Sequence, residues 1–201
     1  MNFYNGHWEK KYGVSMYHPQ EIYEWHRGNE ELVFLAPHQK IYGKGMTLDG
    51  VVLTFHVSVG GSDIFHIVVE HYQGVVDCGP DFIVEEKREP LHLSEEENSL
   101  TLCCGESELR IEKSPLSFTF YYRGNYMTRM ESSDFAYVRT DDTGVLLYEE
   151  RAGAAYMQGA TSLGVGELIY GLGERFGPLV KNGQTIDIWN EDGGTSSELS
   201  Y

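Results

Sequence analysis

Hydrophobic and polar residues alternate along two stretches of the chain, residues 53–59 (LTFHVSV) and residues 116–122 (LSFTFYY). Successive side chains of a β-strand point to opposite faces of the sheet, so every second residue of such a stretch enters the core. The pattern therefore predicts two core strands. The side chains expected to be buried on them are Leu53, Phe55, Val57, Leu116, Phe118 and Phe120.

Shorter stretches with strand-like composition occupy residues 21–26, 31–36, 63–72, 99–104, 108–113 and 144–150. Residues typical of turns separate them, as in RGNEE, LDG, GGSD, CGES, RGN and DDTG. The acidic run SEEENS at 94–99 is interpreted as a solvated hairpin turn, because like charges resist burial. No stretch of a dozen residues shows the 3.6-residue period of a helix. The chain is therefore predicted to be all-β, an antiparallel sandwich or barrel.

The composition changes after about residue 150, where small residues and glycines become frequent. We expect one β-sandwich domain over residues 1–201, with its main strands in about 1–150. Residues 151–201 are expected to be a loop-rich segment that first covers the sandwich and then leaves it.

The chain is 41% hydrophobic and 13% aromatic, which is typical of a globular protein, and its formal net charge is −16. This charge argues against a nucleic-acid partner and against docking on anionic lipid. The N-terminal residues MNFYNGHWEKKYG lack the apolar run of a signal peptide, and no stretch approaches the roughly 20 apolar residues that span a membrane. A cytoplasmic protein without a membrane partner is therefore expected.

Cys78, Cys103 and Cys104 have neither the regular spacing of a disulfide framework nor that of metal ligands. They are expected to be buried or half-buried free thiols, with Cys103 and Cys104 on opposite faces of one strand.

Several patterns associated with catalysis or cofactors are incomplete. The stretch GLGERFG has Phe176 where a dinucleotide-binding fingerprint needs its third glycine, and Pro178 follows where a helix should begin. His56, His66 and His71 form no metal-ligand pair, and no G-x-S-x-G element occurs. Adjacent carboxylates are common on surfaces and do not by themselves make an acid–base pair. No metal or other cofactor is expected.

The stretch WNEDGGTSSE combines an aromatic side chain, amides, carboxylates and hydroxyls in one loop. Proteins recognise sugars with aromatic surfaces and charge-assisted hydrogen bonds, which Trp189 and Asp192 supply here. Asn190 and Thr195 are further candidates for substrate binding. An ordinary turn is the alternative, because Thr195 and Glu198 also match a helix capping box.

The same region resembles the end of the N-terminal domain of glycoside hydrolase family 31, and within it the bacterial α-xylosidase branch. The matching elements are YGLGERF at 170–176, LVKNGQT at 179–185 and WNEDGGTS at 189–196. Upstream, HPQEIYEW, TLDGVVLTFHV and IVVEHYQGVVDCGPDF occur where that family has strands. The resemblance covers essentially the whole chain.

This resemblance implies a β-sandwich of the galactose-mutarotase-like type with a loop-rich C-terminal extension. In the family a (β/α)8 barrel follows, and two aspartates of the barrel hydrolyse α-glycosidic bonds by a retaining mechanism. No catalytic residue is then expected among these 201 residues, whose partner would be the barrel of the full-length enzyme. The loop that matches WNEDGG reaches over the barrel mouth, so the resemblance implies that Asp192 contacts oligosaccharide substrate. Trp189, Asn190 and Thr195 are expected to support the loop or make secondary contacts, and the full-length protein is expected to have homo-oligomer contacts.

Two other functions stay open at this point. One is a stand-alone carbohydrate-binding sandwich without hydrolase activity. The other is an epimerase of the mutarotase type, which needs a histidine and a carboxylate on one concave face. Leu199 and Glu191 stand where the α-xylosidase branch usually has glutamine and arginine, so the choice between xylosyl and glucosyl substrates is also open.

Overall fold

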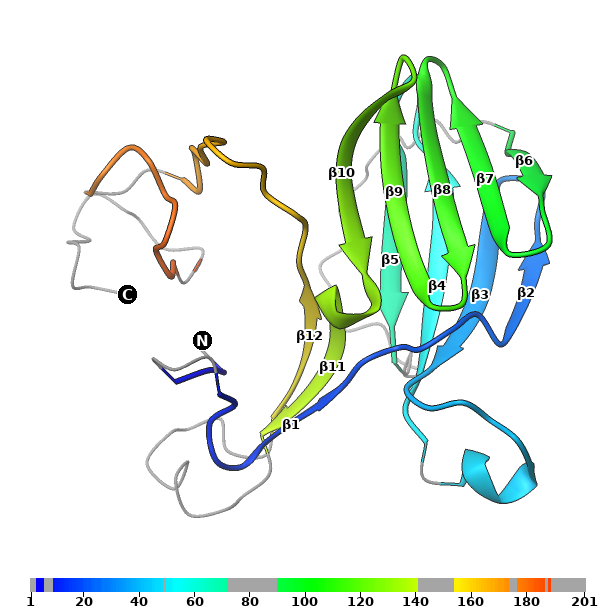
Figure 1. Ribbon diagram of the computed structural model, residues 1–201, viewed down its shortest axis with the longest axis horizontal. Helices are drawn as coiled ribbons and strands as arrows, with labels where there is room; N and C mark the ends of the chain where they lie inside the picture. Colours follow the sequence, from blue (N-terminus) through cyan, green and yellow to red (C-terminus); the bar gives the residue numbers. More distant parts are fainter. Residues whose placement is uncertain are drawn as a thin grey trace, which may run out of the picture. The chain divides into compact units, whose positions relative to one another are not determined.

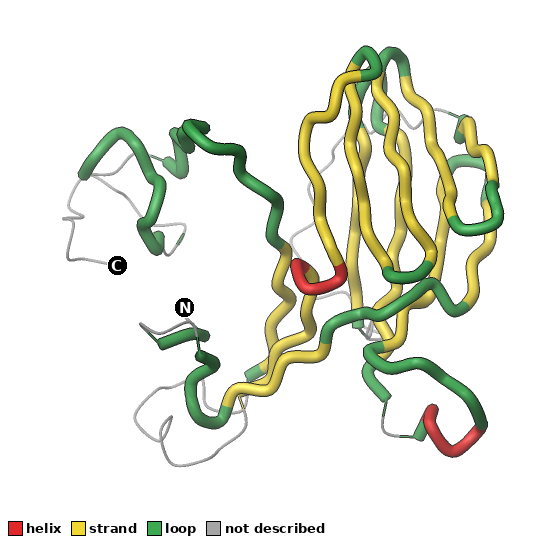
Figure 2. The backbone as a smooth tube through the Cα atoms, viewed as in Figure 1, coloured by secondary structure: helices red, strands yellow, loops and turns green. Residues whose placement is uncertain are grey.

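The computed structural model describes residues 3–5, 9–48, 50–71, 90–140, 154–173, 177–186 and 188. The chain divides into two compact units, residues 13–162 and residues 1–12 with 163–201. Figure 2 shows that strands dominate the first unit, whereas the described residues beyond 162 are loop.

The described strands all belong to the first unit and are short. They are β1 (Val14–Tyr17), β2 (Glu24–Arg27), β3 (Glu31–Pro37), β4 (Val52–Val59), β5 (Phe65–Glu70), β6 (His92–Glu95), β7 (Ser99–Cys104), β8 (Ser107–Lys113), β9 (Leu116–Tyr122), β10 (Asn125–Glu131), β11 (Phe135–Thr140) and β12 (Ala155–Gly159). Two 3-10 turns, η1 (Lys44–Thr47) and η2 (Ser132–Asp134), interrupt them. No α-helix occurs within the described ranges, in agreement with the absence of a 3.6-residue period.

The strands form three antiparallel sheets. Their strand orders are β2-β3-β4-β5, β10-β9-β8-β7-β6 and β1-β11-β12. Figure 1 shows the five-stranded sheet in front of the four-stranded sheet. The predicted all-β antiparallel sandwich is thus confirmed.

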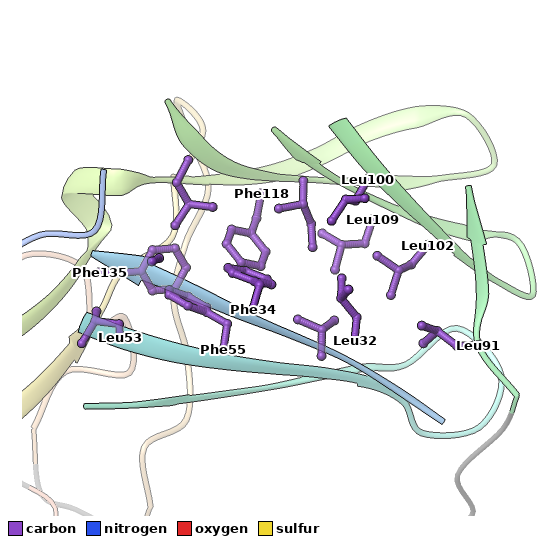
Figure 3. Packing of buried hydrophobic residues seen from close by; sticks show 14 of the residues in the cluster. Leu32, Phe34, Leu53, Phe55, Leu91, Leu100, Leu102, Leu109, Phe118 and Phe135 are labelled. Atoms are coloured by element: carbon purple, nitrogen blue, oxygen red, sulfur yellow. The ribbon is translucent and has the colours of Figure 1, made fainter. Parts of the chain in front are cut away.

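The core lies between the two larger sheets (Figure 3). Of the six predicted core residues, Leu53, Phe55, Val57, Leu116 and Phe118 are each at most 1% exposed. Phe120 is only partly buried, because burial decreases along β9 toward its exposed end at Tyr122. The alternation therefore identified the correct face of both strands but not where the core ends.

Phe34 on β3 was missing from the predicted core, although it is fully buried. It is the register partner of Phe55, and the two rings stack 4.7 Å apart at an interplanar angle of 7°. The stretch ELVFLA is apolar almost throughout, and five of the seven residues of β3 are buried. A continuous apolar run does not reveal which of its residues face the partner sheet.

The predicted turn at 94–99 is confirmed as the hairpin between β6 and β7, closed by a 2.9 Å bond from the Glu96 N–H to the Ser99 carbonyl. The turn is shorter than predicted, because β6 ends at Glu95 and the buried Ser99 begins β7. β1, β6, β10, β11 and β12 were not among the predicted strands. β10 has a bulge between Tyr126 and Thr128 that breaks its alternation, and β12 lies in the glycine-rich stretch. The predicted strand at 144–150 lies outside the described residues.

Candidate functional site

The four predicted substrate-binding residues, Trp189, Asn190, Asp192 and Thr195, lie outside the described residues. Their roles therefore stay predictions. The structure does describe most of the chain that leads to this loop.

Asn182 holds two stretches of the second unit together. Its Oδ1 accepts a 2.8 Å hydrogen bond from the Ile169 N–H, and its Nδ2 donates a 3.0 Å bond to the Glu167 carbonyl. The Lys181 N–H donates to the Ile169 carbonyl at 2.8 Å. The Asn182 side chain thus bonds to the backbone of residues 167–169 much as a neighbouring strand would. It joins residues 167–169 to LVKNGQT, one of the elements that carry the family resemblance.

The chain reverses at Asn182–Gly183, six residues before the predicted loop begins at Trp189. Gly183 has a φ of 74°, in the left-handed region that glycine occupies without strain, and the Gln184 N–H donates to the Lys181 carbonyl at 3.2 Å. The Gln184 side chain donates to the Val180 carbonyl at 2.7 Å. Lys181 is buried, and its ammonium group donates to the Pro178 carbonyl at 2.7 Å. These bonds give residues 178–184 a defined backbone course.

Large apolar side chains are exposed along the C-terminal part of the second unit. They are Leu163, Val165, Leu168, Ile169, Tyr170, Leu172, Leu179 and Ile188. Single exposed apolar residues are ordinary, but a concentration of this size within one segment is typical of a surface that contacts another protein domain.

The three histidines considered as metal ligands lie in different surroundings. His56 Nδ1 lies 3.4 Å from the Glu31 carboxylate, and His71 Nδ1 lies 3.0 Å from the Val52 carbonyl. His66 is exposed on β5. No group of three or more His, Cys, Asp or Glu residues suited to hold a metal ion exists in the described part of the chain.

Cys103 and Cys104 are free thiols, one exposed and one buried, so they lie on opposite faces of β7 as predicted. The expectation that all three thiols are at least half-buried is wrong for Cys103, which is on the outer face of its sheet. Partial burial raises the pKa of the Cys103 thiol, and the Glu108 carboxylate raises it further. Cys104 Sγ donates to the Gly61 carbonyl at 2.9 Å. Cys78 lies outside the described residues.

Within the described residues, no helix is long and hydrophobic enough to span a membrane.

Comparisons with known proteins agree with this architecture. The family model of the glycosyl hydrolase 31 N-terminal galactose mutarotase-like domain matches residues 54–201. The chain is 28% identical over 202 residues to α-xylosidase XylQ of Lactiplantibacillus pentosus, and the match covers 100% of this chain and 25% of that protein. It is 35% identical over 172 residues to an α-xylosidase of Emericella nidulans, with 79% of this chain and 22% of that protein covered.

Two solved structures share the fold. A glycoside hydrolase family 31 dextranase of Flavobacterium johnsoniae aligns with a TM-score of 0.60 at 14% identity, covering 87% of this chain and 19% of that one. A cycloalternan-forming enzyme of Listeria monocytogenes aligns with a TM-score of 0.59 at 12% identity, covering 85% of this chain and 14% of that one. At such identities the likeness concerns the fold alone.

The chain thus spans about a quarter of the length of the curated relatives it matches. The family match extends over most of the chain and includes the sandwich from β4 onward and the loop-rich segment. The chain belongs to the glycosyl hydrolase 31 N-terminal galactose mutarotase-like domain family.

Proposed function

We propose that this chain is the non-catalytic N-terminal domain of an α-xylosidase-like enzyme that releases terminal α-linked xylose from oligosaccharides. The observation that carries this proposal is the match of the whole chain to about a quarter of an α-xylosidase. The second curated relative bears the same name and is 35% identical.

The catalytic groups are proposed to lie in a (β/α)8 barrel that follows these residues. Retaining glycosidases place two carboxyl groups about 5 Å apart, one as nucleophile and one as general acid/base. Residues 1–201 are proposed to have no catalytic role. They would support the barrel and narrow the substrate entrance.

The second unit carries the features that suit a contact with the barrel. Its exposed apolar side chains, among them Leu179 and Ile188, would become buried there, and burial of apolar surface stabilises association. The turn at Asn182–Gly183 belongs to the same unit and precedes Asp192 along the sequence. We propose that the Asp192 carboxylate accepts hydrogen bonds from vicinal sugar hydroxyls, supported by Trp189, Asn190 and Thr195.

An assay with p-nitrophenyl α-xyloside and p-nitrophenyl α-glucoside tests this proposal. The coding sequence is expected to continue past codon 201 into barrel strands, and the full-length protein should hydrolyse the xyloside faster than the glucoside. The 201-residue chain alone should hydrolyse neither. Hydrolysis by the 201-residue chain would refute the proposal that the catalytic groups lie beyond these residues. A preference of the full-length protein for the glucoside would refute the proposed xylosyl specificity.

A further inference from the structure

Two tyrosines face each other on the outer side of the five-stranded sheet. Tyr121 on β9 and Tyr126 on β10 are register partners, and their ring centroids lie 6.4 Å apart at 81°. Side chains alternate along β9, so Tyr121 points away from the core that Phe118 and Phe120 enter. Tyr126 is 56% exposed, which leaves much of its ring available to a ligand.

The exposed ring of Tyr126 is held in place by Ser162. The Tyr126 hydroxyl lies 3.2 Å from Ser162 Oγ, which also lies 3.1 Å from Thr128 Oγ1 and accepts a 3.0 Å bond from the Arg129 N–H. The Ser162 backbone is fixed in turn, because its N–H donates to the Arg129 carbonyl at 3.0 Å and its carbonyl accepts from Thr128 Oγ1 at 3.0 Å. An exposed tyrosine ordinarily loses rotamer freedom when it binds a ligand. Here the fold has already restricted that freedom, which lowers the entropic cost of binding.

The groups beside Tyr126 and further along β10 suit an uncharged, hydroxyl-rich ligand. Ser162 and Thr128 supply hydroxyls next to the Tyr126 ring, and further along the strand the Arg129 guanidinium lies 3.4 Å from the Glu131 carboxylate. Because Arg129 and Glu131 balance each other in charge, this surface favours a neutral molecule over an anion. A fixed aromatic ring beside hydroxyls and charged hydrogen-bonding groups is the combination that recognises sugars.

We propose that Tyr126, Tyr121, Thr128, Arg129 and Ser162 form a binding site for neutral oligosaccharides. Tyr126 is the platform on which a sugar ring stacks, and Ser162 is the positioning residue that fixes this platform. The choice of oligosaccharide as ligand rests on the proposed function, whereas the arrangement of the site does not. Such a site would hold a long substrate near the enzyme between cleavage events.

The test uses the ¹⁵N-labelled 201-residue chain, titrated with a xyloglucan-derived heptasaccharide and followed by amide chemical shifts. Shifts are expected at Tyr126, Arg129 and Ser162. Tyr126→Ala should weaken binding about tenfold, and Tyr126→Phe, which keeps the ring, by no more than about threefold. Ser162→Ala leaves every aromatic ring in place and should weaken binding by about twofold to fivefold, because the Tyr126 ring is released.

A control variant separates this site from other binding. Tyr42→Ala removes a different tyrosine that is 83% exposed. It should bind the heptasaccharide as the unmodified chain does. Absence of shifts at the highest soluble heptasaccharide concentration, full binding by Tyr126→Ala, or loss of binding by Tyr42→Ala would overturn the proposal. Binding is measured on the 201-residue chain and hydrolysis of p-nitrophenyl α-xyloside on the full-length protein, so failure of this site and failure of the proposed activity give different results.

Discussion

The ring of Phe55 on β4 lies 5.6 Å from the ring of Phe118 on β9, so the two large sheets meet through two fully buried aromatic side chains. Phe135, at the start of β11, lies 5.2 Å from both rings. The third sheet is therefore joined to the core that the first two sheets share (Figure 3). This aromatic cluster is the part of the molecule on which cooperative folding is expected to depend.

Phe118→Ala should lower the free energy of unfolding by about 3–5 kcal/mol, because it removes a large buried side chain and leaves a cavity between the sheets. Urea denaturation of the 201-residue chain measures this change. Phe120→Ala is the matched control on the same strand. Its loss should be clearly smaller, because Phe120 is only partly buried. Equal losses for the two variants would contradict the described boundary of the core.

Asn182→Ala should speed hydrogen exchange of the Ile169 amide by about fivefold to tenfold, since a hydrogen bond contributes about 0.5–1.5 kcal/mol. The variant removes the acceptor of this amide and the donor to the Glu167 carbonyl. Exchange measured by NMR on the 201-residue chain gives the result. Gln184→Ala breaks a different side-chain bond of the same turn and should leave exchange at Ile169 unchanged. An Ile169 amide that exchanges equally fast in the unmodified chain and in Asn182→Ala would show that Asn182 does not hold the two stretches together.

Cys103 and Cys104 should differ in their reaction with a thiol reagent such as DTNB in a Cys78→Ser background. Exposed Cys103 should react in the folded protein, and buried Cys104 only after unfolding. Partial burial raises the pKa of Cys103, so its reaction at pH 8 should be slower than that of a free thiol and should accelerate as the pH rises.

The Glu108→Gln variant tests the second cause of this raised pKa. Removing the negative charge favours the thiolate, which lowers the pKa and should increase the rate at pH 8 by about twofold to fivefold. An unchanged rate would mean that burial alone controls Cys103.

In the full-length enzyme, Asp192→Ala should lower kcat/KM by about tenfold to a hundredfold, equivalent to about 1.5–3 kcal/mol for a charge-assisted hydrogen bond to substrate. Steady-state kinetics with p-nitrophenyl α-xyloside provide the measurement. Glu191→Gln, a change at the neighbouring carboxylate, is the control and should remain within about twofold. If Asp192→Ala has unchanged kinetics, the loop does not touch the substrate.

Much of the fold could be predicted from the sequence, because alternation is a local property of a strand. Leu53 and Phe55 were placed on the buried face of β4 from their spacing alone, and Leu116 and Phe118 on that of β9. The hairpin between β6 and β7 followed from a run of like charges. β10 was not predicted, because its bulge at Tyr126–Thr128 interrupts the alternation on which the prediction depends.

Less of the candidate site than of the fold could be predicted from the sequence. The residues of WNEDGGTS were selected by their chemistry and by the family resemblance, and their roles stay predictions. The bonds that Asn182 and Ser162 make had no sequence signal, since asparagine and serine are common in turns and loops. Only the distances in the structure distinguish these two residues from ordinary loop positions.

The sequence by itself determined that the chain is all-β, that Phe55 and Phe118 are buried, and, through the long motif near its C-terminus, which family it belongs to. The tertiary structure alone decided that Phe34 stacks on Phe55, that Cys104 bonds to Gly61, and that Ser162 fixes the ring of Tyr126. The physical reason is the range of the interactions. Strand periodicity depends on neighbouring residues, whereas these contacts join residues from 21 to 43 positions apart, whose meeting depends on the path of the intervening chain.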